Sequence, residues 1–372
     1  MAGTFRSFIL AGLAVLTLAA CASRGTITLD PAAGEVGSVE DILVASARVP
    51  LAQGYGYSAE VARGLSFSEV QVSIPPDRLP GTVSFPAAGR DPDPRTDFLT
   101  VSATRLPDRA AFVRAVNARL RGKPASQREA FVFVHGFNTN FAEGLYRQAQ
   151  MRHDFQSPGI SVNFAWPSAA RISAYGTDRE SALVARDALQ DLLDTLAQTN
   201  VSRIVVLGHS MGAFVAMEGL RQVALSDDRP VLAKMDSVVL MAPDLDIEVF
   251  RRQMQPLADK GVEAYIFTSS RDLALRVSAR LRGSTERLGL ITGEGPVSGL
   301  PVEVIDLSAL DTSGDVSTHF KVATSPTVIA MARGMGTVGL EILRDQTPGV
   351  APIGAGLIAG AALSISDGPG GR

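Results

Sequence analysis

The 372-residue chain has one cysteine, one tryptophan and four histidines, and aromatic residues make up only 6% of it. A single cysteine excludes an intrachain disulfide and a cysteine cluster for a metal. The net charge is only -3 and the basic residues are scattered, which gives no electrostatic reason to expect a nucleic-acid partner. Because the sequence also has no H-E-x-x-H motif and no phosphate-binding loop, we expect neither a metal nor an organic cofactor.

The sequence offers no confident membrane-spanning segment. Its N-terminal apolar run, residues 8–20, follows Arg6 and has the length of the hydrophobic region of a signal peptide. The run ends in LAA followed by Cys21, which resembles the lipobox of bacterial lipoproteins. We therefore expect Cys21 to be lipidated, the alternative being an ordinary signal peptide or an uncleaved anchor with a coincidental cysteine. Since Ala22 rather than aspartate follows, the pattern resembles that of Gram-negative lipoproteins sent to the outer membrane.

Composition divides the chain into four parts. We expect a lipoprotein signal peptide over residues 1–20, a lipidated tether over 21–45, one folded domain over 46–345 and a Gly/Ala-rich tail over 346–372. The tether is expected because its residues are small and polar with little periodicity. The tail favours a flexible or surface-packed segment, with weak membrane or partner contact as the alternative.

The first part of the folded domain is predicted to contain antiparallel edge strands. Apolar and polar residues alternate over 67–74 and 98–106, and a shorter strand is expected near 83–85. Apolar residues at helical spacing follow over 109–120, which predicts a helix.

From residue 128 onward, buried strands alternate with helices. Strands are predicted at 131–138, 160–166, 204–207, 237–243, 262–270 and 302–308. Helices are predicted at 141–155, 177–198, 213–220, 272–282 and 325–344, the second of them capped by Thr177 or Asp178. This alternation predicts a doubly wound, mostly parallel sheet in which the carboxyl ends of the strands meet at one edge.

One short motif lies between the 204–207 strand and the helix after it. Gly208-His209-Ser210-Met211-Gly212 has the layout of a nucleophile elbow, a sharp turn with a serine at its tip. Side chains at the two glycine positions would collide with the neighbouring strand and helix. Ser210 is therefore the candidate nucleophile, and the alternative is an ordinary turn serine.

A serine nucleophile needs a positioned base and an acid that orients this base. His319 follows the last predicted strand, which puts it at the same edge of the sheet as Ser210, and it is the predicted base. Asp272 follows the 262–270 strand and Arg271 and is the predicted acid, although the same residue could simply cap the next helix. Asp244 and Asp246, which follow the preceding strand, remain alternatives.

Backbone N–H groups are expected to stabilise the oxyanion that such a nucleophile generates. One is the N–H of Met211, directly after the serine. The other is the N–H of Phe137, in a loop where Gly136 lets the backbone approach closely. Asn138 is expected to brace this loop or to donate directly.

The motifs VFVHGFN, FAWPS, GHSMG, SSRDLAL and STHF together resemble a poorly characterised bacterial group of esterase/lipase-like α/β-hydrolases, several of them envelope lipoproteins. The resemblance covers about residues 60–340 and implies an eight-stranded, mostly parallel sheet that starts with antiparallel strands. It implies Ser210, Asp272 and His319 as a catalytic triad, with Phe137 and Met211 at the oxyanion hole. It does not supply a substrate, and no long apolar insertion between residues 243 and 262 suggests a lipase-type lid.

These observations predict a serine hydrolase that cleaves a small-molecule or lipid ester through an acyl-enzyme. Two alternatives stay open: a non-catalytic envelope lipoprotein that uses the fold for binding, and an acyltransferase or peptidase with the same triad. The expected location is the bacterial cell envelope, with Cys21 as the lipid anchor at the periplasmic face of the outer membrane. The sequence indicates neither the acyl chain length nor the oligomeric state.

Overall fold

The structure is a computed structural model of the chain. It describes residues 24–156, 159–281, 283, 286–309, 318–325 and 328–329. The expected signal peptide, Cys21, most of the helix predicted at 325–344 and the tail lie outside the described residues.

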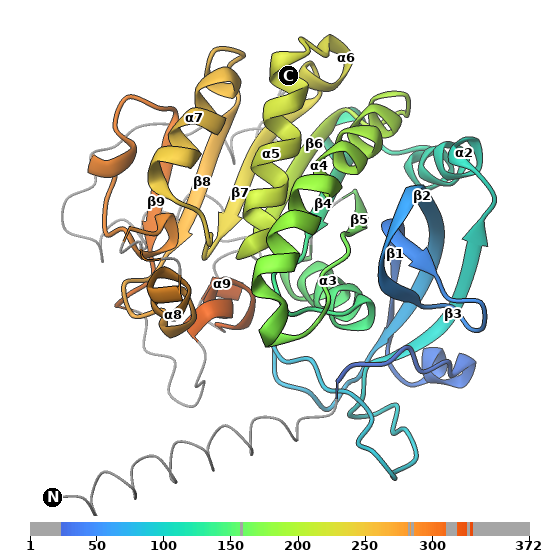
Figure 1. Cartoon of the computed structure of the whole chain (residues 1–372). Helices are drawn as coiled ribbons and strands as arrows, with labels where there is room; N and C mark the ends of the chain where they lie inside the picture. Colours follow the sequence, from blue (N-terminus) through green and yellow to red (C-terminus); the bar gives the residue numbers. More distant parts are fainter. Residues whose placement is uncertain are drawn as a thin grey trace, which may run out of the picture.

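The described residues form a single nine-stranded sheet in the order β3-β2-β1-β5-β4-β6-β7-β8-β9 (Figure 1). β2 runs antiparallel to both β1 and β3, and all neighbours from β1 to β9 are parallel. The prediction of a mostly parallel sheet with antiparallel N-terminal strands is confirmed, with nine strands in place of the eight implied by the resemblance. The strands are β1 Ser38–Pro50, β2 Tyr57–Ile74, β3 Leu99–Leu106, β4 Glu129–Val134, β5 Ile160–Ala165, β6 Arg203–His209, β7 Met235–Met241, β8 Glu263–Thr268 and β9 Val302–Asp306.

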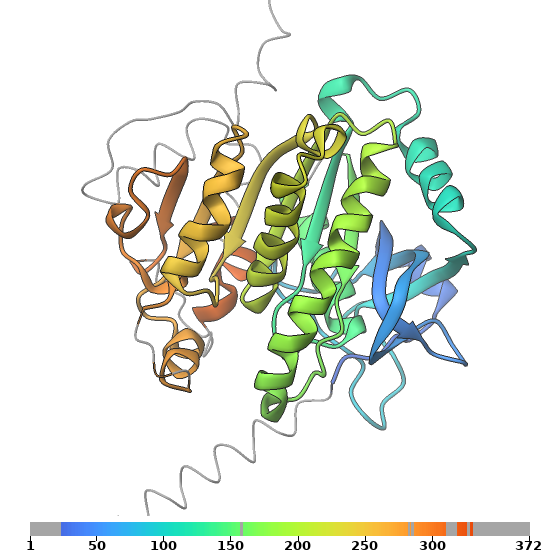
Figure 2. The same cartoon turned by 45° about the horizontal axis from the view of Figure 1, so that its top comes forward.

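Helices cover both faces of this sheet. α4, α5 and α7 lie side by side on one face, and α3 and α9 lie on the other (Figures 1 and 2). Among the described helices, none is both long enough and apolar enough to cross a bilayer. The helices are α2 Arg109–Leu120, α3 Phe141–Phe155, α4 Tyr175–Ala197, α5 Met211–Leu225, α6 Arg229–Leu232, α7 Ile247–Ala258, α8 Leu273–Leu281 and α9 Lys321–Thr324.

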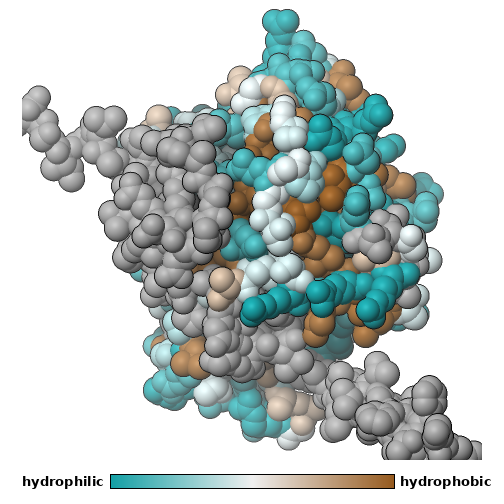
Figure 3. Space-filling model, turned by 90° about the vertical axis from the view of Figure 1, so that its left-hand side faces the viewer, coloured by the Kyte–Doolittle hydropathy of each residue, from teal (hydrophilic) through white to brown (hydrophobic). Residues whose placement is uncertain are grey.

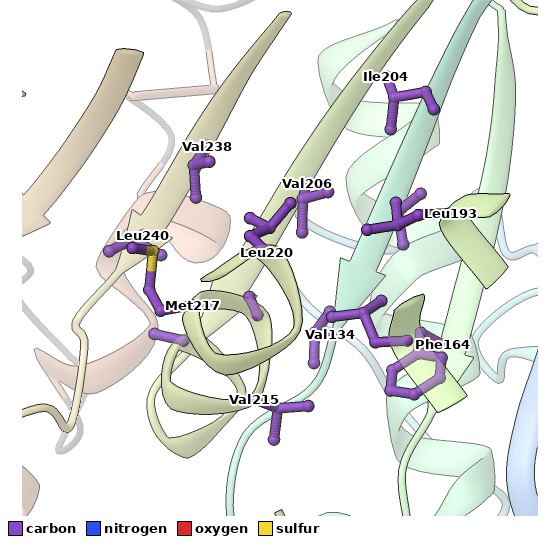
Figure 4. Close-up of a cluster of buried hydrophobic side chains, with 14 of the residues drawn as sticks. Val134, Phe164, Leu193, Ile204, Val206, Val215, Met217, Leu220, Val238 and Leu240 are labelled. Atoms are coloured by element: carbon purple, nitrogen blue, oxygen red, sulfur yellow. The ribbon is translucent and has the colours of Figure 1, made fainter. Parts of the chain in front are cut away.

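The interior strand β6 shows why the parallel strands are continuous apolar runs. Ile204 and Val206 point to one face, where they join a cluster built with α4 and α5 (Figure 4). Leu207 belongs to a second cluster that contains Phe133 of β4 and Met151 of α3. Each fully buried aliphatic side chain contributes about 1.5–3 kcal/mol. Because both faces of β6 are buried, apolar residues occupy successive positions along it. The same packing fixes the position of the turn that follows β6 relative to the sheet.

The expected tether over residues 21–45 is wrong from Arg24 onward. Residues 42–45 are fully buried in β1, which lies between β2 and β5 inside the sheet. The segment has few large side chains, but its short apolar run gains a neighbouring strand on each side. The folded domain therefore includes residues well before position 46.

Two smaller expectations also differ from the structure, and one helix was not expected. Residues 83–85 form no strand. The second long helix begins at Tyr175, and neither Thr177 nor Asp178 caps it, because Ala174 is the N-cap residue and makes no side-chain cap. The helix α7 has no counterpart in the sequence prediction.

Candidate active site

Ser210 lies in a strained turn between β6 and α5. Its backbone has φ 53° and ψ −121°, in the left-handed half of the map that residues with a Cβ rarely adopt. A Cβ at Gly208 would lie 2.6 Å from the Cα of Ala213, and one at Gly212 would overlap the carbonyl oxygens of Val134 and His135. Both glycines are therefore required for the helix to start so close to β4 and β6. The serine is the N-cap residue of α5, where the helix dipole favours negative charge.

His319 and Asp272 form a direct pair. The Nδ1 atom of His319 lies 2.7 Å from Oδ2 of Asp272, whose side chain is completely buried. Because an ionised carboxylate only accepts hydrogen bonds, Nδ1 carries the proton and donates it, which leaves Nε2 as the basic nitrogen. Oδ1 of Asp272 accepts a bond of 3.1 Å from the N–H of Leu275, so the residue also caps the start of α8. The two oxygens of Asp272 therefore serve the helix cap and the bond to His319 at the same time.

A cavity of about 850 Å³ joins these elements. Ser210, His319 and Phe137 all line it, together with apolar side chains from several loops. Asp272 is bonded to His319 but is not among the residues that line the cavity. Met211 is the first residue of α5, directly after Ser210. All five residues predicted for the site therefore lie at one edge of the sheet, where the carboxyl ends of the parallel strands meet.

The loop after β4 passes close to Ser210. A Cβ at Gly136 would lie 3.1 Å from the Cβ of Ser210, which confirms the prediction of a close backbone approach. Asn138 has φ 54° and braces the loop: its Oδ1 accepts a bond of 3.1 Å from Arg24, and its carbonyl accepts one of 3.0 Å from the same guanidinium.

Arg48 of β1 supports the same loop and was not predicted. Its guanidinium donates to the carbonyl of Thr139 at 2.9 Å and to the carbonyl of Ser168 at 3.1 Å. Burial lowers the pKa of Arg48 to about 10, and the side chain is only 1% exposed. A third carbonyl, that of Ser58, accepts from the same guanidinium at 3.3 Å. This buried cation fixes the loop that contains Phe137 relative to the loop after β5. A lone arginine in a strand carries no sequence signal for this role.

Two further histidines lie near the site and are held neutral. Burial, with a smaller effect from Arg48, lowers the pKa of His135 to about 3, and the His135 ring stacks on Trp166. Burial also lowers the pKa of His209 well below its usual value, and the neighbouring His319 lowers it further. A nitrogen that binds a proton so weakly is a poor general base, so neither His135 nor His209 fits that role.

Asp244, an alternative acid, lies in a network of its own. Its carboxylate accepts bonds from the hydroxyls of Tyr175 and Ser278, each at 2.7 Å, and pairs with the buried Arg287 at 3.4 Å. Its N–H donates to the carbonyl of Ser210 at 3.2 Å. Asp246 instead caps α7. Of Asp244, Asp246 and Asp272, the residue whose carboxylate is bonded to the ring of His319 is Asp272.

The matched family model decides the superfamily. Residues 108–335 match the family described as alpha/beta hydrolase of unknown function (DUF900). The chain belongs to this family. The match spans every residue predicted for the site, and membership of this α/β-hydrolase family supports hydrolase activity. Within the described residues of this hydrolase, no group of three or more His, Cys, Asp or Glu side chains could hold a metal ion.

Solved structures with some similarity to this α/β-hydrolase include three hydrolases. A fungal esterase from Rhizomucor miehei is 12% identical, with 84% of this chain and 86% of that chain covered and a TM-score of 0.37. An esterase from Pyrobaculum calidifontis is 13% identical, with 84% and 86% covered and a TM-score of 0.34. A dienelactone hydrolase from Anabaena variabilis is 11% identical, with 78% and 95% covered and a TM-score of 0.35. No curated protein matches the chain.

Proposed function

We propose that this α/β-hydrolase is a serine hydrolase that cleaves carboxylic esters with Ser210 as nucleophile, His319 as base and Asp272 as the orienting acid. The observation that carries the proposal is the 2.7 Å bond between His319 Nδ1 and Asp272, with His319 and Ser210 in one cavity. A serine in a strained turn, a histidine and a buried carboxylate are the parts that an acyl-transfer site requires.

In the proposed reaction, Nε2 of His319 takes the proton of Ser210 and the serine oxygen attacks the ester carbonyl. The backbone N–H groups of Phe137 and Met211 stabilise the oxyanion that forms. The protonated His319 then gives its proton to the leaving alcohol, which leaves an acyl group on Ser210. Water, deprotonated by the same histidine, attacks the acyl-enzyme, and the acid and free serine are released.

The lining of the cavity supports an ester with an apolar portion. Val83, Phe85, Ile172, Leu273 and Val277 all face the space that holds Ser210. Apolar walls favour an acyl chain because its burial removes hydrocarbon surface from water.

A fluorophosphonate probe and a chain-length panel of p-nitrophenyl esters test the proposal. Ser210→Ala should abolish both labelling and turnover. The control variant is Ser226→Ala, since Ser226 is exposed just after α5 and should leave both unchanged. Equal labelling of wild type and Ser210→Ala refutes the nucleophile. Amide substrates and alcohol acceptors in the same panel separate an ester hydrolase from a peptidase or an acyltransferase, and binding without turnover indicates a non-catalytic lipoprotein.

We also propose that Cys21 is lipidated and anchors the enzyme at the periplasmic face of the outer membrane. The proposal rests on the apolar run that ends at this cysteine. The mass of the N-terminal peptide from membrane-extracted protein tests it. An unmodified Cys21, or a chain that starts elsewhere, contradicts it.

A further inference from the structure

The exposed face of α8 is apolar and basic. Leu273 is 59% exposed and Val277 is 55% exposed, and Arg276 and Arg280 are exposed beside them. The helix, LALRVSARL, contains no acidic residue. Exposed apolar side chains flanked by arginines are typical of helices that lie in the interface of an anionic bilayer, because the apolar tips enter the lipid while the guanidinium groups reach the headgroups.

These apolar residues surround the opening of the cavity that holds Ser210. Leu273 and Val277 line this cavity from α8, and Ile172, which is 75% exposed, lines it from the loop after β5. α8 lies at the lower edge of the molecule in Figure 1. On the side shown in Figure 3, the hydrophobic residues drawn in colour lie among hydrophilic ones.

The start of the described chain lies at the same opening. Arg24 lines the cavity and pairs with Glu143 at 2.8 Å, and the N–H of Gly25 donates to the same carboxylate at 3.2 Å. Cys21 precedes Arg24 by three residues, a length that spans at most about 11 Å even when fully extended. A lipid on Cys21 would therefore hold this edge of the molecule, and not the opposite one, against the membrane.

We propose that α8 and Ile172 dock the cavity opening onto an anionic lipid bilayer, so that the ester substrate enters from the membrane. The inference deepens the proposed function and rests on it for the substrate, and on the lipidation of Cys21 for the anchor. A bilayer fits this surface because the lipid on Cys21 would hold the surface against it. Its negative headgroups complement Arg276 and Arg280, and its hydrocarbon accepts apolar side chains without a matching pocket.

Fluorescence quenching in vesicles measures the orientation directly. Val277→Cys in the full lipid-modified chain provides one free thiol for an environment-sensitive NBD label. The matched control is Leu225→Cys, since Leu225 is 59% exposed and ends α5, which starts at Met211, directly after Ser210, and runs for 15 residues away from the opening. At 1.5 Å per residue, the two ends of α5 are about 22 Å apart. The labelled proteins are reconstituted in vesicles of phosphatidylcholine and phosphatidylglycerol that contain a doxyl-labelled lipid.

We expect a blue shift and at least twofold quenching at position 277 and neither effect at position 225. Replacing Arg276 and Arg280 together by glutamate should reduce the quenching at 277 to the level of the control. Absence of quenching at 277, equal quenching at both positions, or an unmodified Cys21 overturns the inference. Because the measurement also works in a Ser210→Ala background, quenching without ester hydrolysis supports the docking and refutes only the proposed reaction, whereas hydrolysis without quenching refutes only the docking.

Discussion

The Nε2 atom of His209 lies 3.1 Å from the carbonyl oxygen of His319, so the residue before the proposed nucleophile holds the backbone of the proposed base. Since a carbonyl only accepts, Nε2 carries the proton and donates it. The His209 ring also stacks on Phe320, with the ring centroids 3.8 Å apart. The elbow and the loop after β9 are thereby fixed to one another by contacts from a single side chain.

Removing this donor should lower turnover with little effect on substrate binding. His209→Phe keeps an aromatic ring against Phe320 but loses the hydrogen bond to His319. We expect kcat to fall about tenfold, because a hydrogen bond of this kind contributes about 1–1.5 kcal/mol. KM should stay within about twofold, because His209 is not among the residues that line the cavity.

The conservative variant separates positioning from general stability. His209→Gln supplies an amide N–H in place of the ring N–H, and we expect it to retain more of the wild-type kcat than His209→Phe. Steady-state kinetics and thermal unfolding of both variants check the point. Equal kcat losses in both variants that track their melting temperatures would indicate a structural role only.

The two carboxylates near the site should respond differently to amidation. Asp272→Asn should lower kcat by about 10³–10⁴-fold, because an amide can no longer hold the ring of His319 in the right tautomer. Asp244→Asn should leave most of kcat but lower the free energy of unfolding by about 3 kcal/mol, because Arg287 would stay buried without its carboxylate.

Kinetics on an activated ester and chemical denaturation of each variant test this pair. The reverse result, a large kcat loss for Asp244→Asn and a small one for Asp272→Asn, would make Asp244 the orienting acid. Such an outcome would require the loop with His319 to turn toward Tyr175 and Ser278 during catalysis.

Much of the α/β core could be predicted because its signals are local. The strand before Ser210 reads as a continuous apolar run since both of its faces are buried, and the helix at 141–155 has a capping box of Asn140 and Glu143 at its start. The order of these elements along the chain was enough to bring Ser210, Asp272 and His319 to one edge.

The parts that could not be predicted depend on neighbours distant in sequence. β1 has only a short apolar run, and its stability comes from β2 and β5 on either side of it. The helix α7 does carry a periodic signal in Ile247, Phe250, Met254 and Leu257, but Pro256 inside it resembles a helix break. The role of Arg48 depends on carbonyls contributed by two separate loops, which no spacing in the sequence encodes.

Acid should destabilise this hydrolase through its buried histidines. The pKa of His135 is lowered to about 3, and that of His209 is also lowered well below its usual value. In the unfolded chain both rings return to about 6.5. Between about pH 6.5 and pH 3 the unfolded chain therefore binds protons that the folded chain does not.

The free energy of unfolding is thus highest above about pH 6.5 and should fall as the pH is lowered through this window. The slope is at most about 1.4 kcal/mol per pH unit for each histidine. Urea denaturation at pH 7.5, 6.5 and 5.5 measures it, and His209→Gln should remove about half of the slope. A free energy of unfolding that rises as the pH falls from 7.5 to 5.5 would contradict the assignment of both rings as neutral.

Adding one methyl group at Gly212, in the first turn of α5, should disrupt the site. A Cβ there would overlap the carbonyl oxygens of Val134 and His135, which belong to the end of β4 and the loop that leads to Phe137. Neither carbonyl can move without shifting the proposed oxyanion donor. We expect Gly212→Ala to lower the free energy of unfolding by about 2–3 kcal/mol.

The matched control is Gly176→Ala, since Gly176 lies in the first turn of α4 with no atom within 4 Å of its added Cβ. That variant should be more stable than wild type by about 0.5–1 kcal/mol, because alanine has less conformational freedom to lose in a helix. Denaturation curves and fluorophosphonate labelling rates of the two variants complete the comparison. If Gly212→Ala folded normally and labelled at the wild-type rate, α5 could move away from β4 without cost, and the close approach of helix and strand would not be what positions Ser210.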